Sequence, residues 1–198
     1  MAESEAVPAV AWYADPEQAL EEAGRSGRPV FVFVFRPGCS GCRLMDQGTF
    51  PRSAVRQALT EWVPLRLTEG HPFTRGRGLL WFPELLALEP DGALLRRQPG
   101  YLPAAEFLPW LILVQGEWAM RREAYEQAAA LFEQVITAFP ASGWVPEAWY
   151  WLGAARHQAT GREIELYRPW RELRLRYPQS LWAHKVQANW QPPAPEAE

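Results

Sequence analysis

The sequence predicts an α/β domain in its first half, followed by an all-α region of repeated helical hairpins. The run Val30–Phe35 is apolar throughout and consists of β-branched and aromatic residues, which is typical of a central strand that helices cover on both faces. Segments with strand-like and helix-like composition alternate around this run. In the second half, helical patterns recur with a period of 38 residues, which indicates a repeat architecture.

Local signals predict each element of the first half. Asp15 is a favourable N-cap and Pro16 a favourable first helical residue, so a short helix is expected over residues 17–23. A short strand around residues 10–13 is expected before it. Asp91-Gly92 is a two-residue hairpin signal. The other expected elements are the core strand over 29–35, a helix over 42–50 with Gly48 as its kink or end, a helix over 52–59, strands over 62–67, 85–88 and 93–96, and a helix over 103–113.

Both cysteines lie in one string, Cys39-Ser40-Gly41-Cys42, shortly after the predicted core strand. If a helix begins there, the second thiol curls back onto the first, and the pair can exchange disulfides with a substrate. Because the chain has no other cysteine, a structural disulfide framework is excluded and a zinc site of cysteines alone is incomplete. The alternative is an inert buried pair. Redox chemistry is the favoured interpretation, with Cys39 as the nucleophile at a helix N-terminus and Cys42 as the resolving thiol.

Three further features accompany the cysteine pair along the chain: Phe82-Pro83 opening the hairpin strand, Asp91-Gly92 at its turn, and Gly100-Tyr101 before the last helix. This set resembles the thioredoxin fold. Over residues 9–115 the resemblance implies a central mixed sheet flanked by helices. A finer pattern resembles the bacterial subgroup called thioredoxin-like domain 7. It consists of residues 11–13, Glu17, residues 19–23, residues 27–29, and Cys42, Met45, Thr49 and Phe50.

The resemblance also implies roles for particular residues. In thioredoxins the proline that opens the hairpin strand is cis and faces the disulfide, and the backbone before it pairs with a bound substrate strand. The catalytic residues that the resemblance implies are Cys39, Cys42 and Pro83. The substrate-binding residues that it implies are Phe82, Ser40 and Gly41.

One departure from the family pattern concerns proton transfer. Phe33 stands six residues before the first cysteine, where thioredoxins proper carry a buried Asp that helps to move the proton of the second thiol. Asp46, one helical turn beyond Cys42, and Glu69 are the acidic residues expected near the thiols. Either is a candidate replacement, although ordinary surface charge is the favoured interpretation of both.

The second half resembles tetratricopeptide repeats. Small Ala128, the aromatic Phe132 four residues later and Pro140 at the helix end have the spacing of a packed helical hairpin. The residues that match them at an offset of 38 are Leu166, Trp170 and Pro178. We expect such repeats over residues 116–190. The helix from about residue 104 is expected to continue to about 120 and lead the first repeat, and a short cap is expected over residues 181–190.

Composition limits the partners and the location. The net charge is −3 without a block of one sign, so no nucleic-acid partner is expected. The first twelve residues lack Lys, Arg and an apolar stretch, and no apolar run is long enough for a bilayer, so we expect a cytoplasmic protein without a membrane segment. Residues 1–8 and 191–198 are rich in Pro, Ala and Glu and are expected to be disordered. The histidines show no ligand spacing, so neither a metal nor a cofactor is expected.

These features together predict a thiol-disulfide oxidoreductase that acts on protein disulfides and is reduced again by an unidentified thiol donor. The repeats would bind the client or another peptide or protein partner. The alternative is a chaperone-linked adaptor that joins a thioredoxin domain to tetratricopeptide repeats and has little redox turnover. The intact C-x-x-C pair favours the enzyme, whereas Phe33 and the small number of repeats leave the adaptor open.

Overall fold

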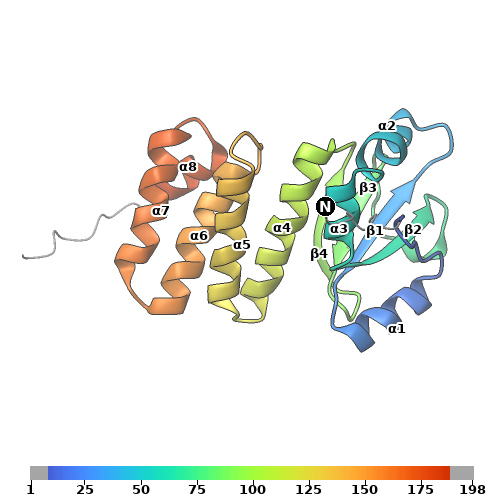
Figure 1. The fold of residues 1–198 in the computed structure, drawn as a ribbon, viewed down its shortest axis with the longest axis horizontal. Coiled ribbons are helices and arrows are strands. Elements are labelled where there is room, and N and C mark those ends of the chain that lie inside the picture. Colours follow the sequence, from blue (N-terminus) through green and yellow to red (C-terminus); the bar gives the residue numbers. More distant parts are fainter. Residues whose placement is uncertain (1–8, 188–198) are drawn as a thin grey trace, which may run out of the picture. The chain divides into compact units, whose positions relative to one another are not determined.

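The computed structural model describes residues 9–187, and the chain divides into two compact units, Met1–Leu108 and Pro109–Glu198 (Figure 1). The division falls inside one helix, α4 (Ala104–Arg121). The tails expected at residues 1–8 and 191–198 lie outside the described residues.

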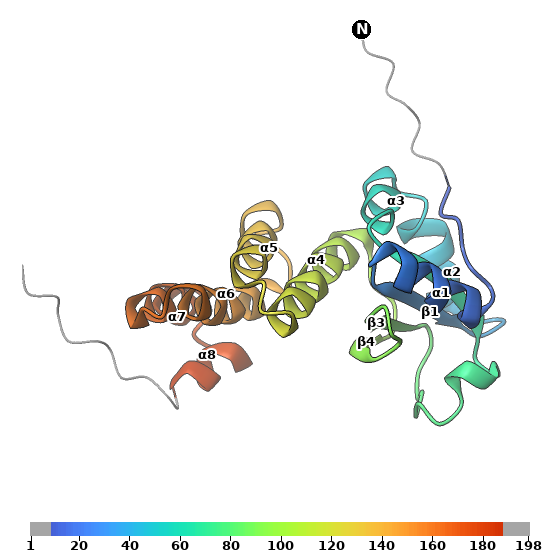
Figure 2. The same ribbon diagram turned by 90° about the horizontal axis from the view of Figure 1, so that it is seen from below.

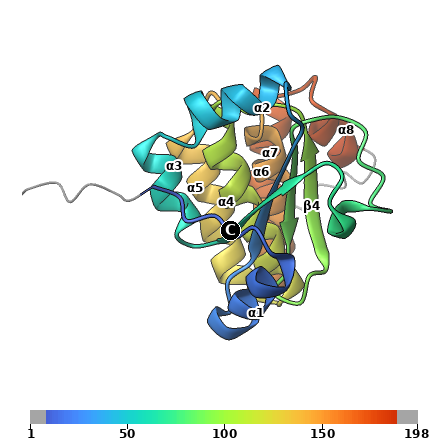
Figure 3. The same ribbon diagram turned by 90° about the vertical axis from the view of Figure 1, so that its right-hand side faces the viewer.

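The first unit contains a four-stranded mixed sheet with the strand order β2-β1-β3-β4. The central strand β1 (Val30–Phe35) pairs in parallel with β2 (Val63–Thr68) and antiparallel with β3 (Glu84–Leu88). The hairpin partner of β3 is β4 (Leu94–Pro99), which lies at the sheet edge (Figure 3). The predicted central strand and mixed sheet are therefore confirmed.

The uniformly apolar sequence of β1 reflects cover on both faces of the sheet. On one face, Val30, Val32 and Val34 share a buried cluster with two alanines of α1 (Pro16–Ser26). On the other face, the rings of Phe31 and Phe33 pack against Phe50, and Phe31 also contacts Phe107 of α4. Successive side chains of a strand point to opposite faces, so a run without polar residues requires this double cover.

The strand expected around residues 10–13 is wrong, because Tyr13 makes only an isolated parallel bridge to Leu65. Its amide donates to the Pro64 carbonyl and its carbonyl accepts from the Arg66 amide, both at 2.8 Å. Extending the ladder backwards would require an N–H on Pro64, which proline lacks. Extending it forwards would require Asp15, whose side chain instead caps α1.

Two other elements of the first unit differ in detail from expectation. The helix expected over 42–50 begins earlier as α2 (Ser40–Leu44) and continues as a π-helix, η1 (Met45–Thr49), before α3 (Ser53–Leu59). The hairpin turn includes Pro90 as well as Asp91-Gly92, because the Glu89 amide donates to the Ala93 carbonyl across three residues. Gly92 has a φ of 88°, which fits a type I turn closed by a left-handed residue.

From α4 to Gln187 the described chain is mainly helical. The helices after α4 are α5 (Tyr125–Ala138), α6 (Val145–Thr160), α7 (Glu163–Arg176) and α8 (Leu181–Gln187). Helix α6 packs against both α5 and α7 (Figure 2). The bounds of α5 and α7 differ by 38 residues at both ends, 125 to 163 and 138 to 176. This agrees with the sequence period, while classification as tetratricopeptide repeats stays a prediction. The expected cap is described only as far as Gln187.

Small residues permit the close approach of these helices. A Cβ atom added at Gly153 of α6 would lie 2.8 Å from both the Leu166 carbonyl oxygen and the Trp170 ring of α7. Gly116 of α4 is similarly covered by the Phe132 ring of α5. In the part of the chain that the structure describes, none of the helices is sufficiently long and apolar to span a membrane.

Candidate functional site

The two cysteines lie where β1 is connected to α2. After β1 the chain turns at Pro37-Gly38, where Gly38 adopts a φ of 78°. Cys39 follows as the extended N-cap of α2, and its Sγ accepts a hydrogen bond from the Cys42 amide at 3.2 Å. An amide N–H at a helix N-terminus stabilises negative charge on the atom that it faces. The Cys39 sulfur therefore occupies the position in this loop that suits a thiolate.

The second thiol is shielded behind the first. Cys42 is 4% exposed, whereas Cys39 is partly exposed, and both are free thiols. Burial, followed by the hydrogen bond with Cys39, raises the pKa of the Cys42 thiol to about 11. A buried thiol loses solvation when it ionises, so its protonated form is favoured. The site thus has one accessible sulfur, that of Cys39, and one buried, protonated sulfur, that of Cys42.

Pro83 and Phe82 lie directly against the cysteine loop. The Phe82–Pro83 peptide bond is cis, and the Cys39 thiol donates to the Phe82 carbonyl oxygen at 3.4 Å. A Cβ atom added at Gly41 would approach the Pro83 Cδ atom to 2.9 Å. The predicted catalytic residues and the predicted substrate-binding residues therefore lie together, although 43 positions separate Cys39 from Phe82 in the sequence.

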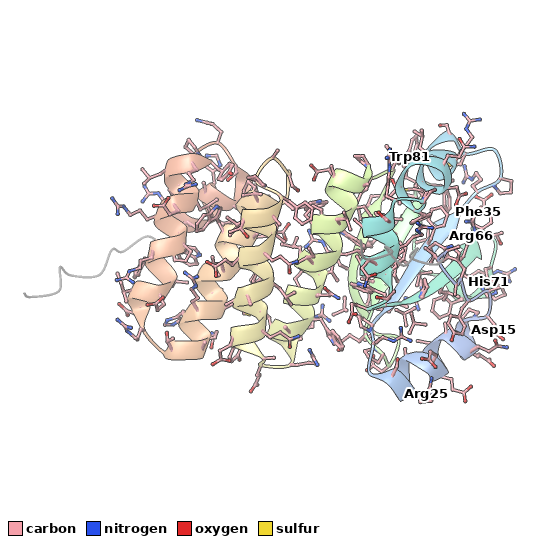
Figure 4. All side chains as sticks on the ribbon, viewed as in Figure 1. Asp15, Arg25, Phe35, Arg66, His71 and Trp81 are labelled. Atoms are coloured by element: carbon pink, nitrogen blue, oxygen red, sulfur yellow. The ribbon has the colours of Figure 1, made fainter. Side chains whose placement is uncertain are left out.

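A cavity of about 500 Å³ opens beside the Cys39 sulfur. Its lining comes from the cysteine loop, the segment before Pro83 and the loop that precedes α4: Arg36, Pro37, Gly38, Cys39, Ser40, Gly41, Leu80, Trp81, Phe82 and Tyr101. Leu80 and Trp81 are 85% and 68% exposed. Trp81 projects from this segment in Figure 4. Sequence reasoning missed these two residues as site residues, although their position just before Phe82-Pro83 was a usable signal.

Residues 16–115, about half of the chain, match the family model of the thioredoxin-like domain. The chain belongs to this family. Among solved structures, it is similar to a thioredoxin from Thermus thermophilus, with 26% identity and a TM-score of 0.51 over 57% of this chain and 93% of that one. It is also similar to the oxidoreductase DsbH, with 17% identity and a TM-score of 0.42 over 51% and 83% of the two chains.

A further similar structure is the oxidised C-terminal domain of DsbD from Neisseria meningitidis, with 22% identity and a TM-score of 0.43 over 50% of this chain and 96% of that one. No protein with a curated description matches this sequence. The thioredoxin-like domain is followed by the helical region from α4 to α8. A thioredoxin-like domain with a C-x-x-C pair at a helix start is the general arrangement of thiol-disulfide oxidoreductases.

In the thioredoxin-like domain, Arg97 of β4 anchors the segment that carries Phe82 and Pro83. Its guanidinium donates to both carboxylate oxygens of Glu84, at 2.9 and 3.1 Å, and Glu84 is fully buried. The same guanidinium donates to the carbonyls of Arg77 and Gly78, each at 3.2 Å. One side chain therefore fixes the segment on both sides of Phe82-Pro83. Sequence reasoning missed it because the contacts depend on the register of the β3–β4 hairpin.

Both acidic residues expected near the thiols form ion pairs. Asp46 accepts two hydrogen bonds from Arg66, at 2.6 and 2.9 Å, and Glu69 pairs with Arg36. His71 caps the short helix η2 (Pro72–Thr74), its Nδ1 accepting from the Phe73 amide. Within residues 9–187, His, Cys, Asp and Glu side chains form no group that would hold a metal ion.

Proposed function

We propose that this protein is a thiol-disulfide oxidoreductase that uses Cys39 and Cys42 on protein disulfides. The observation that carries the proposal is the arrangement of the two thiols at one helix start. Cys39 is partly exposed beside an open cavity, and Cys42 is buried behind it with a raised pKa. Exchange requires this asymmetry, because one sulfur must meet the substrate while the other waits.

The reaction proceeds in two exchanges. The Cys39 thiolate attacks one sulfur of the substrate disulfide, whose S–S bond breaks, and the other substrate sulfur leaves as a thiolate. Cys42 then loses its proton and attacks the Cys39 sulfur, which releases the second substrate thiolate and leaves a Cys39–Cys42 disulfide. The substrate gains two electrons and the cysteine pair loses two. A separate thiol donor returns both electrons to the pair.

The backbone beside Cys39 is suited to hold a substrate chain. Ser40, Gly41 and Phe82 all line the cavity beside Cys39. Within the described part of the chain, the Phe82 amide donates no hydrogen bond to another protein group. An extended substrate segment beside Phe82 would satisfy this amide, as an added strand does at a sheet edge. We assign Pro83 the role of holding Phe82 in this position.

The helical region and the location complete the proposal. We assign the helices from α5 to α8 the binding of a client or partner protein, on the support of their hairpin arrangement and the 38-residue offset. We propose the cytoplasm as the protein's location, a compartment whose thiol reductants supply the electrons that the pair needs.

Enlarging Gly41 is expected to damage the site selectively. In Gly41→Ala the new Cβ would lie 2.9 Å from the Pro83 Cδ atom. The proline ring is part of the backbone and cannot rotate away, so Pro83 or the start of α2 must shift. We expect disulfide reduction to slow by about 10- to 100-fold. The matched control is Gly48→Ala, whose Cβ meets nothing closer than 3.8 Å. Equal activity in the two variants would contradict the placement of Gly41.

The test of the function is reduction of insulin disulfides, with dithiothreitol as the thiol donor. The wild-type protein is expected to accelerate the reaction well beyond dithiothreitol alone. Cys39→Ser is expected to give only the background rate, with a circular dichroism spectrum that matches the wild type. If the fully reduced wild-type protein does not accelerate insulin reduction, the oxidoreductase function is rejected and the adaptor function is favoured.

A further inference from the structure

The resolving step requires an acceptor for the proton of Cys42. This thiol is 4% exposed, and burial raises its pKa to about 11, so at neutral pH almost every Cys42 carries a proton. Phe33 of β1 is fully buried and has no group that accepts a proton. The acceptor must therefore come from another element beside α2.

Asp46 is placed to receive this proton. It lies four residues after Cys42, where α2 continues into η1, and residues at this spacing in a helix are neighbours on one face. Asp46 is also the carboxylate whose negative charge contributes to the raised pKa of Cys42 by repulsion. The repulsion agrees with the placement of the carboxylate on the same helical face as the thiol.

Arg66 fixes the orientation of the Asp46 carboxylate. The two side chains are 30% and 35% exposed, and they are joined by two parallel hydrogen bonds of 2.6 and 2.9 Å. Arg66 pairs with Phe33 in the β1–β2 register, and its guanidinium lies 5.2 Å from the Phe33 ring and 4.5 Å from the Phe35 ring. Bidentate pairing and stacking on two rings restrict the guanidinium to one geometry. Figure 4 shows Arg66 beside Phe35.

A second cavity opens beside Arg66, the partner of Asp46. It has a volume of about 360 Å³, and Trp12, Phe35, Arg66 and His71 are among its lining residues. The titratable and charged groups around Cys42 and Asp46 are thus Cys39 on α2, Arg66 on β2, His71 at the cavity wall and the Arg36–Glu69 pair at the ends of β1 and β2. Asp46 itself is the carboxylate whose negative charge helps to raise the pKa of Cys42.

We propose that Asp46 is the general base of the resolving step and that Arg66 is its positioning residue; this rests on the proposed exchange function. As Cys42 attacks the Cys39 sulfur of the mixed disulfide, its proton passes to the Asp46 carboxylate. The Cys39–substrate S–S bond breaks, the Cys39–Cys42 bond forms, and the substrate leaves as a thiolate. Asp46, whose side chain is 35% exposed, then returns the proton to water. Charge and electrons balance within this step.

The test measures the resolving step directly with the aromatic disulfide DTNB in stopped flow. Attack by Cys39 releases one coloured thiolate, and the resolving attack by Cys42 releases a second one in an intramolecular phase. We expect Asp46→Asn to slow the second phase by about 100-fold and to leave the first phase within about twofold. Asp46→Glu is expected to restore part of the rate. The matched control is Glu22→Gln on α1, which breaks the ion pairs of Glu22 with Arg25 and Arg28. This variant should behave as wild type.

The sign of the change separates a base from a merely repulsive charge. If Asp46 acted only by repulsion, its removal would lower the pKa of Cys42 and accelerate the second phase. An unchanged or faster second phase in Asp46→Asn therefore overturns the proposal. Absence of the second phase in the wild type would instead reject the exchange function itself.

A pH profile of the wild type keeps the test independent of the folding of the variants. An intramolecular base replaces hydroxide as the proton acceptor, so the second-phase rate should rise by much less than tenfold per pH unit between about pH 6 and 8. In Asp46→Asn it should rise by about tenfold per pH unit, because hydroxide then takes the proton. A tenfold rise per unit in the wild type would overturn the proposal, even if Asp46→Asn does not fold.

Discussion

Iodoacetamide is expected to alkylate Cys39 at least about 100 times faster than Cys42 in the reduced protein at pH 7. With a pKa of about 11, Cys42 is a thiolate in only about one molecule in 10⁴, against about one in 10² for a thiol at the ordinary value of 9.0. Its 4% exposure slows the reaction further. Mass spectrometry of digested samples, taken over a time course, measures both rates.

The control for this experiment is the same labelling in guanidinium, where the two rates should become equal. In Cys39→Ser, Cys42 is expected to stay slow at pH 7 and to react faster with each pH step, because burial, the largest cause of its raised pKa, remains. Equal labelling of the two thiols in the folded protein, or faster labelling of Cys42, would contradict their assignment as nucleophile and resolving thiol.

Replacement of Arg97 by Ala is expected to reduce the free energy of unfolding by about 3 kcal/mol. The fully buried Glu84 carboxylate would lose both hydrogen bonds from the guanidinium, and a buried charge without a partner is strongly destabilising. The carbonyls of Arg77 and Gly78 would lose the same donor. Urea denaturation, followed by tryptophan fluorescence, measures the change.

The matched control for Arg97→Ala is Arg25→Ala, which removes an arginine from an ion pair on α1 whose side chain is 75% exposed. It should leave the urea midpoint almost unchanged, since exposed pairs contribute little. A double variant, Glu84→Gln with Arg97→Ala, should be more stable than Arg97→Ala alone, because the buried charge is then gone. If Arg97→Ala denatures at the same urea concentration as Arg25→Ala, the anchor does not stabilise the fold.

The sequence predicted those elements whose signals are local. The central strand β1 followed from its uninterrupted apolar run, α1 from the Asp15 cap, and the hairpin from Asp91-Gly92. The prediction was wrong where a non-local hydrogen bond decided the outcome. The segment around Tyr13 did not become a strand because its neighbour Pro64, about fifty positions away, offers no N–H.

The residues of the candidate site that belong to a sequence motif could be predicted. Those that meet only through tertiary packing could not. The C-x-x-C pair and Phe82-Pro83 are visible in the sequence, and the structure brings them within hydrogen-bond distance. The Asp46–Arg66 and Glu84–Arg97 pairs join residues 20 and 13 positions apart. The Glu84–Arg97 pair depends on the register of the β3–β4 hairpin, and the Asp46–Arg66 pair depends on the packing of η1 beside β2.

The most direct test of the exchange function is equilibration of the protein in glutathione buffers of graded redox ratio, with the thiols counted after acid quenching. We expect the wild type to convert reversibly between a dithiol and an intramolecular Cys39–Cys42 disulfide, along a curve with the slope of a two-electron couple. Cys39→Ser should form no such disulfide. A wild-type protein that remains a dithiol in every buffer, or that only accumulates glutathione adducts, would contradict disulfide exchange by this pair.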